Sequence, residues 1–136
     1  MTKDGPIWLV TLAVGSGAGI GAMLRWALSY KLNGVFSWFP LGTYAANTLG
    51  GFLCGLALAW TATTPSLSPI ARLFVITGFL GGLTTFSTFS GEAFSLLLAG
   101  EALRAGTHVM LHVATSLLAT WAGWTIYRAI FHAIFA

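Results

Sequence analysis

Four long apolar stretches, separated by short links, constrain this chain more than any other feature of its sequence. They run over residues 7–28, 41–61, 73–98 and 107–127. An α-helix needs about 20 residues to cross the hydrocarbon core of a bilayer. Charged residues make up only 7% of the chain, whereas soluble domains carry about 25%. The sequence therefore predicts one all-α domain over residues 1–136, integral to a membrane and surrounded by lipid.

The few basic residues argue against a nucleic-acid partner. The formal net charge is +3, but the lysines and arginines stand singly and never form a run. A nucleic-acid binder needs a basic patch or stripe. We interpret these residues as flanks of the membrane spans instead.

The distribution of positive charge predicts two opposite orientations in the membrane. Four spans put both termini on the same side. The links on that side carry Lys3, Arg72 and Arg128, and the opposite side carries a second group of three. That group consists of Arg25, Lys31 and Arg104. Because loop charge sets orientation, an equal count favours neither one. We therefore expect dual topology, with two antiparallel copies pairing in the functional unit.

The third stretch combines a helix-breaking signal with dense polar side chains. Gly81 and Gly82 are adjacent near its middle, and five of the seven residues from Thr84 to Ser90 carry hydroxyls. A broken helix frees backbone groups, which membranes tolerate only inside protein or beside a water-filled path. We expect a break at the glycine pair. The alternative is a kinked helix whose hydroxyls bond to their own backbone.

The second and fourth stretches also carry polar residues. His108, His112, Ser116 and Thr120 follow each other at intervals of four and form one stripe on a helix. Polar side chains in spans usually face the interior or a cavity. Two histidines at this spacing are also typical of a metal pair, but no acidic residue lies nearby in the sequence. Asn47 needs hydrogen-bond partners and is either an interhelical contact or a pore-lining donor.

Glycines recur at four-residue spacing in the first two stretches. The pairs are Gly15 with Gly19, Gly17 with Gly21, and Gly51 with Gly55. Such pairs let helix backbones approach closely in lipid. We expect them to pack within the subunit or the dimer, and we assign them no chemistry.

Three stretches of the sequence together resemble the Fluc (CrcB) fluoride channels. They are Gly19-x-Gly21-Ala22-x-x-Arg25, then Gly42-Thr43-x-x-x-Asn47-x-x-Gly50-x-Phe52-x-x-Gly55, and then the run from Gly81 to Phe89. The last run is the most specific, and the resemblance covers all four spans. It implies a passive fluoride channel of the cell inner membrane that gives fluoride resistance and is not an enzyme.

The resemblance also implies an assembly and a set of sites. The implied partners of the chain are a second, antiparallel copy of itself, the fluoride ion and the lipid bilayer. The resemblance further implies a structural sodium ion (Na+) at the dimer interface, bound by the backbone carbonyls of Gly81 and Thr84. Arg25 is expected at an aqueous vestibule. The residues expected to line the fluoride pathway are Asn47, Phe86, Phe89, Thr43, Ser87, Thr88, His108, His112, Ser116 and Arg25.

Three other classes of protein fit the sequence less well. A small proton-coupled multidrug exporter needs a carboxylate in its first span, and this first span has none. A membrane hydrolase needs a nucleophile with a base, or a carboxylate and histidine metal site. His108 and His112 have no acidic partner on their own helix. A scaffold subunit would have sealed, well-packed helices and no ion flux.

Overall fold

The computed structural model describes residues 4–36 and 38–135, and these contain four helices long and apolar enough to cross a membrane. The first, second and fourth spans are α1 (Ile7–Leu32), α2 (Leu41–Thr63) and α6 (Ala102–Phe135). The third contains α3 (Pro69–Arg72), the π-helical segment η1 (Leu73–Leu80), α4 (Gly81–Leu83) and α5 (Phe86–Leu98). The prediction of an all-helical chain with four spans is therefore confirmed, and each span is longer than expected.

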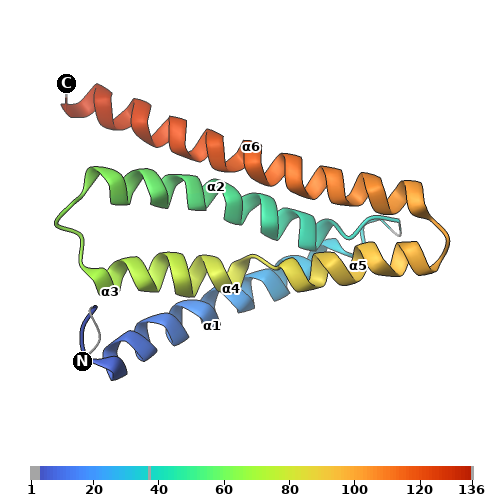
Figure 1. Ribbon diagram of the computed structural model, residues 1–136, viewed down its shortest axis with the longest axis horizontal. Coiled ribbons are helices and arrows are strands. Elements are labelled where there is room, and N and C mark those ends of the chain that lie inside the picture. Colours follow the sequence, from blue (N-terminus) through green and yellow to red (C-terminus); the bar gives the residue numbers. More distant parts are fainter. Residues whose placement is uncertain (1–3, 37, 136) are drawn as a thin grey trace.

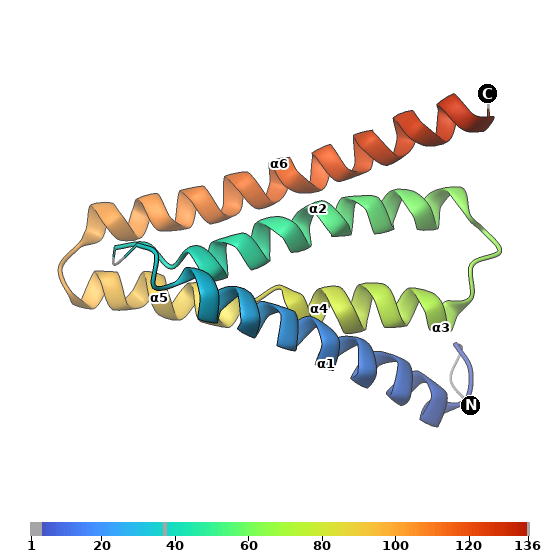
Figure 2. The same ribbon diagram turned by 180° about the vertical axis from the view of Figure 1, so that it is seen from behind.

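The spans run roughly lengthwise, with both ends of the chain at the same end of the molecule (Figures 1 and 2). α2 packs along α6, and α5 also contacts α6. α1 crosses the third span over η1 and α4 (Figure 2). The polar residues of α2, α5 and α6 therefore share one half of the bundle.

Prolines and one glycine set the ends of the helices. Pro6 and Pro40 precede α1 and α2, and Pro69 is the first residue of α3. Proline suits these places because the first turn of a helix does not use its own N–H groups. Gly100 has φ of 77° and makes the turn from α5 to α6, a conformation that glycine adopts readily.

Glycines hold α1 directly against the backbone of the third span. A Cβ on Gly17 or Gly21 would collide with backbone atoms of η1 and α4, and one on Gly82 would lie 2.9 Å from the Cα of Ala18. Gly15 and Gly19 have open space instead. Of the two glycine pairs on this helix, only Gly17 and Gly21 pack inside the subunit.

The interruption of the third span lies after the glycine pair and not at it. Gly81 and Gly82 belong to α4, whereas Thr84 (φ −84°, ψ 156°) and Thr85 (φ −147°, ψ 120°) are extended. The predicted position was wrong because Gly82 is needed for the close approach of α1 to a regular helix. Of the two extended residues, Thr85 instead finds its partner on α2, whereas Thr84 bonds back to Leu80 of its own span.

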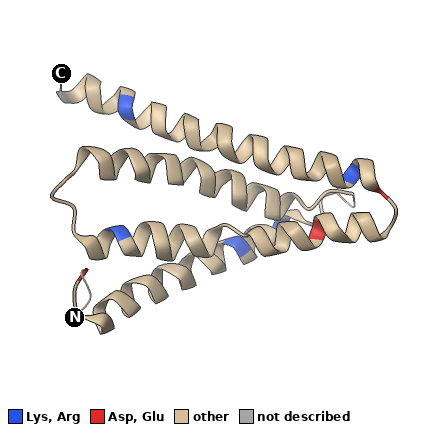
Figure 3. Ribbon diagram, in the orientation of Figure 1, with Lys and Arg blue, Asp and Glu red and all other residues tan. Residues whose placement is uncertain are grey.

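Charged residues lie mostly near the helix ends (Figure 3), but Arg25 does not. It lies inside α1, and its Nε donates to the carbonyl of Gly82 at 3.0 Å. The carbonyl at the end of α4 therefore holds the side chain of Arg25, and its expected place at an aqueous vestibule stays a prediction. Lys3, which entered the charge count, lies outside the described residues.

Replacing Gly21 by alanine tests the contact between α1 and the third span. The new Cβ would meet backbone atoms, which cannot rotate away as a side chain can, and overpacking of this kind costs about 1–3 kcal/mol. We expect Gly21→Ala to lower the midpoint of unfolding by SDS in mixed micelles. Gly106→Ala is the matched control, since its Cβ has open space. Equal midpoints for both variants would contradict the packing described.

Candidate functional site at the interrupted third span

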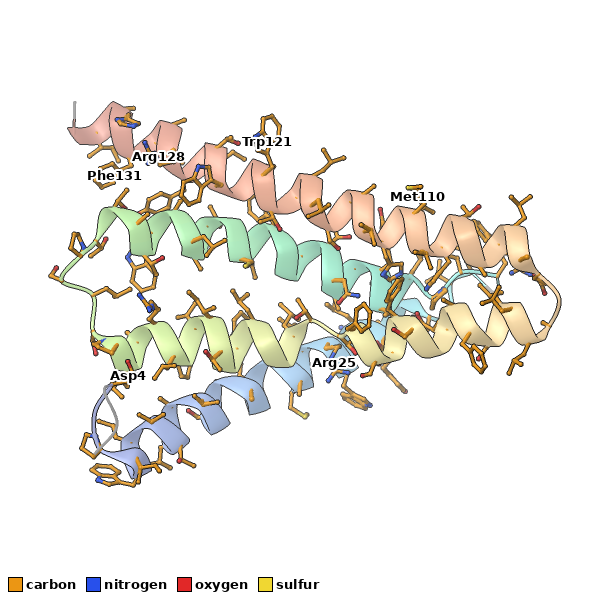
Figure 4. All side chains as sticks on the ribbon, in the orientation of Figure 1. Asp4, Arg25, Met110, Trp121, Arg128 and Phe131 are labelled. Atoms are coloured by element: carbon orange, nitrogen blue, oxygen red, sulfur yellow. The ribbon has the colours of Figure 1, made fainter. Side chains whose placement is uncertain are left out.

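The backbone groups released where α4 ends are taken up by neighbouring side chains. The carbonyl of Leu80 accepts from the N–H of Thr84 at 3.0 Å and from its hydroxyl at 2.9 Å. The carbonyl of Gly82 accepts from Arg25, and Figure 4 shows Arg25 beside the non-helical connection. An unpaired backbone group costs several kcal/mol in hydrocarbon, so these contacts stabilise the end of α4.

Asn47 of α2 holds the extended backbone of Thr85 at two points. The N–H of Thr85 donates to Asn47 Oδ1 at 2.8 Å, and Asn47 Nδ2 donates to the carbonyl of Thr85 at 3.0 Å. A carboxamide matches a peptide group in this way because it has one donor and one acceptor side by side. Asn47 Nδ2 also lies 3.4 Å from His112 Nδ1. Asn47 therefore links the interruption, through Thr85, to α6, through His112.

Thr85 also begins α5. Its hydroxyl accepts from the N–H of Thr88 at 3.1 Å and lies 3.0 Å from the hydroxyl of Thr88 and 3.3 Å from that of Ser87. This is an N-cap, which satisfies one of the free N–H groups at a helix start. Ser87 and Thr88 are exposed. The hydroxyl-rich run thus caps α5, and its helix N-terminus carries a positive partial charge.

A cavity of about 540 Å³ lies against the interruption, and we name it the central cavity. It gathers residues from α2, the third span and α6, including seven of the predicted pathway and sodium residues. These seven are Asn47, Gly81, Thr84, Phe86, Phe89, His112 and Ser116. Five other predicted site residues do not line it, namely Thr43, Ser87, Thr88, His108 and Arg25.

The two phenylalanines differ in exposure. Phe86 is 80% exposed on this single subunit, whereas Phe89 is 8% exposed. Their ring centroids lie 5.6 Å apart with planes inclined at 55°. Phe89 also stacks on His108 at 5.5 Å and lies 4.9 Å from His112. One ring therefore belongs to the core, and the other projects from the surface beside the central cavity.

Glu92 is the main site residue that the sequence analysis left without a role. Its Oε1 accepts from the hydroxyl of Thr43 at 2.6 Å, and its Oε2 lies 3.4 Å from His108 Nε2. The histidines have no acidic partner on their own helix, but α5 supplies one in space. A signal was present, because Glu92 and His108 are each eight residues from Gly100, and an antiparallel hairpin turning there places them side by side.

A second hollow of about 620 Å³, which we name the outer hollow, opens at the end of the bundle near Gly100. Glu92 lines it together with Asn33, Phe39 and Arg104. Arg104 pairs with Glu101 and donates to the carbonyl of Trp38 at 2.9 Å. Glu92 faces the outer hollow and His112 faces the central cavity. The cluster of Glu92, His108 and His112 therefore lies between the two spaces.

Comparison with known proteins gives a consistent result. Residues 12–124 match the family described as "CrcB-like protein, Camphor Resistance (CrcB)". A protein of Aromatoleum aromaticum named "Fluoride-specific ion channel FluC" is 52% identical over 87% of this chain and 90% of its own length. Proteins of the same name are 52% identical in Chromohalobacter salexigens, over 91% and 94%, and 55% identical in Pseudomonas putida, over 82% and 88%.

Replacing Asn47 by leucine tests the two-point contact. Leucine keeps the approximate size but leaves the N–H and the carbonyl of Thr85 unpaired, at a cost of about 1–3 kcal/mol for each group. We expect a lower SDS midpoint and faster hydrogen exchange of the Thr85 amide by NMR. Thr48→Val on the same helix is the control, because Thr48 makes only a 3.4 Å contact with Thr115. Unchanged exchange at Thr85 in Asn47→Leu would contradict the contact.

Proposed function

The chain belongs to the CrcB-like family, and we propose that it is a fluoride-specific ion channel through which cytoplasmic fluoride leaves down its electrochemical gradient, giving fluoride resistance. It is a multi-pass membrane protein of four spans and not an enzyme. Hydrogen fluoride crosses membranes and dissociates inside the less acidic cytoplasm. A passive pathway for the trapped anion is sufficient to lower its concentration.

The observation that carries this proposal is the contact between Asn47 and Thr85 at the edge of the central cavity. Fluoride is small and strongly hydrated, so a pathway must replace its water with closely spaced donors. The amide of Asn47 and the hydroxyls of Ser116, Ser87 and Thr88 are neutral donors of this kind. Neutral donors favour entry of the ion without holding it too tightly to leave.

Phe86 and Phe89 extend the proposed pathway with aromatic edges. The edge of a phenyl ring is positive and its face is negative. Fluoride passing along the central cavity approaches these rings edge-on. The 80% exposure of Phe86 suits a ring that meets a partner subunit.

The remaining polar residues mark a way from the central cavity to the outer hollow. His112, His108 and Thr43 surround the carboxylate of Glu92 between the two spaces. Arg104 lines the outer hollow, and a cation at this position attracts an anion toward the pathway. We assign a vestibule role to Arg104 as well, beside the one that the resemblance implies for Arg25.

We further infer an antiparallel homodimer in the cell inner membrane. Near the helix ends, Arg72 and Arg128 lie toward one end of the bundle and Lys31 and Arg104 toward the other. This balance supports insertion in both orientations. The outward glycines Gly15 and Gly19 and the exposed ring of Phe86 supply a close-packing surface for the second copy.

A sodium ion at the centre of that dimer fits the backbone of the interruption. In a continuous helix the N–H of Thr85 would donate to the carbonyl of Gly81, but here it donates to Asn47. This leaves the Gly81 carbonyl, with that of the extended Thr84, as oxygen ligands that suit a hard cation. The bound ion would brace the two subunits and add positive potential beside the pathway.

Fluoride efflux from liposomes tests the function. Protein reconstituted into vesicles loaded with potassium fluoride is treated with valinomycin, and fluoride is followed with an electrode. We expect fast efflux that protein-free vesicles lack, and no corresponding release from vesicles loaded with chloride. Well-folded protein that releases no fluoride would overturn the proposal.

Replacing Phe86 tests the aromatic edge. Phe86→Ile removes the positive edge but keeps an apolar side chain. A barrier higher by about 1.4 kcal/mol slows passage roughly tenfold, so we expect at least that reduction in fluoride efflux. Phe94→Ile is the matched control, since Phe94 is 59% exposed on the same helix and lines neither space. Equal efflux from both variants would remove Phe86 from the pathway.

Single cysteines test dual topology. In a Cys54→Ser background, Ser66→Cys and Gly34→Cys place thiols in exposed links at opposite ends of the bundle. We expect an impermeant maleimide on intact cells to label each site to roughly half the level reached after lysis, because the charge bias is balanced. Full labelling at one site and none at the other would establish a single orientation.

A further inference from the structure

Three metal-binding side chains converge between the central cavity and the outer hollow. Glu92 comes from α5, and His108 and His112 come from α6. One ligand atom from each lies within 4.8 Å of those of the other two. His108 and His112 are 2% and 3% exposed. Among the described residues, Glu92 Oε2 and His112 Nε2 have no hydrogen-bond partner, although buried polar atoms nearly always have one.

This set of side chains has the chemistry of a zinc site. Two histidines and one glutamate are a frequent ligand set for Zn²⁺, with nitrogen and oxygen about 2.0–2.2 Å from the metal. Two ligands at that distance and a tetrahedral angle lie about 3.4 Å apart. His108 Nε2 and Glu92 Oε2 are already 3.4 Å apart. Only a modest movement of His112 is needed to complete three ligands.

A further contact orients the carboxylate. The hydroxyl of Thr43, which is 1% exposed, donates to Glu92 Oε1. Partners of this type fix a ligand's direction and support metal affinity. This bond occupies Oε1 and leaves Oε2 of Glu92 directed to the histidines. The carboxylate and the two imidazoles can therefore bind the same cation.

We propose that Glu92, His108 and His112 bind a divalent transition-metal cation of the Zn²⁺ class, and that the bound cation closes the route between the central cavity and the outer hollow. Access is available, because Glu92 lines the outer hollow. Closure follows from position, because His112 lines the central cavity on the other side of the cluster. The closure rests on the proposed fluoride channel, whereas the metal site does not.

Metal binding is measured first, on the intact protein in detergent without any ion flux. Zn²⁺ is titrated in competition with a chromogenic chelator of known affinity. We expect one saturable site per chain in the wild type. Loss of a residue that only supports a metal ligand typically weakens metal affinity by about 10–100-fold. We therefore expect loss of a ligand itself, in Glu92→Gln, His108→Gln or His112→Gln, to weaken Zn²⁺ binding by about tenfold or more. His132→Gln is the control, because His132 is exposed near the end of α6.

The outcomes separate clearly when each variant elutes at the wild-type size. Loss of binding in the three cluster variants, with retention in His132→Gln, supports the site. No saturable binding by the wild type overturns it and leaves the cluster as an arrangement of side chains that shares a proton. Equal affinity in all variants also overturns it, because zinc would then bind elsewhere.

Fluoride efflux tests the closure. Micromolar Zn²⁺ added outside wild-type proteoliposomes should slow efflux at least tenfold, and EDTA should restore it. His132→Gln should respond as the wild type does. Efflux without zinc establishes the channel, so its absence refutes the proposed function and not the metal site. Normal efflux that zinc does not slow, in protein that binds zinc, overturns the closure.

Discussion

The two hydrogen bonds between Asn47 and the backbone of Thr85 are the contact on which the rest of the site depends. Inside a membrane no water replaces a lost helical hydrogen bond, so an extended residue persists only where protein supplies a donor and an acceptor. One asparagine supplies both. With Arg25 on the carbonyl of Gly82, it allows the third span to leave the helical path and resume it two residues later.

The close packing of α1 and the interruption support each other. Gly17 and Gly21 bring α1 against η1 and α4, and this approach puts Arg25 within reach of the end of α4. On the other side, α2 brings Asn47 to Thr85, and α6 brings His112 to Asn47. The central cavity is lined mainly by apolar residues, with Asn47, Thr84 and Ser116 among its neutral polar groups and no lysine or arginine among the described residues that line it. In the proposed function, a neutral lining favours passage of an anion over tight binding.

The apolar lengths were sufficient to predict four spans. The resemblance to the Fluc channels, rather than any local pattern, pointed to the predicted site residues, of which seven line the central cavity. The position of the interruption was not predictable from glycine content, because Gly82 is needed for the contact with α1 and the extended Thr85 depends on a partner 38 positions away. The contact of Arg25 with the carbonyl of Gly82 was not predictable for the same reason. Glu92 was undervalued because its partners, Thr43 and His108, lie on other helices. Tertiary contacts of this kind leave no local pattern in a sequence.

Solid-state NMR of isotopically labelled protein in lipid bilayers, titrated with fluoride and with chloride at equal ionic strength, reports on both the interruption and the anion that meets it. We expect extended carbon shifts at Thr84 and Thr85, helical shifts on both sides, and fluoride-specific changes at the side-chain amide of Asn47 and at Phe86. Helical shifts through Thr84 and Thr85, or equal responses to the two anions, would contradict an interrupted third span that selects fluoride.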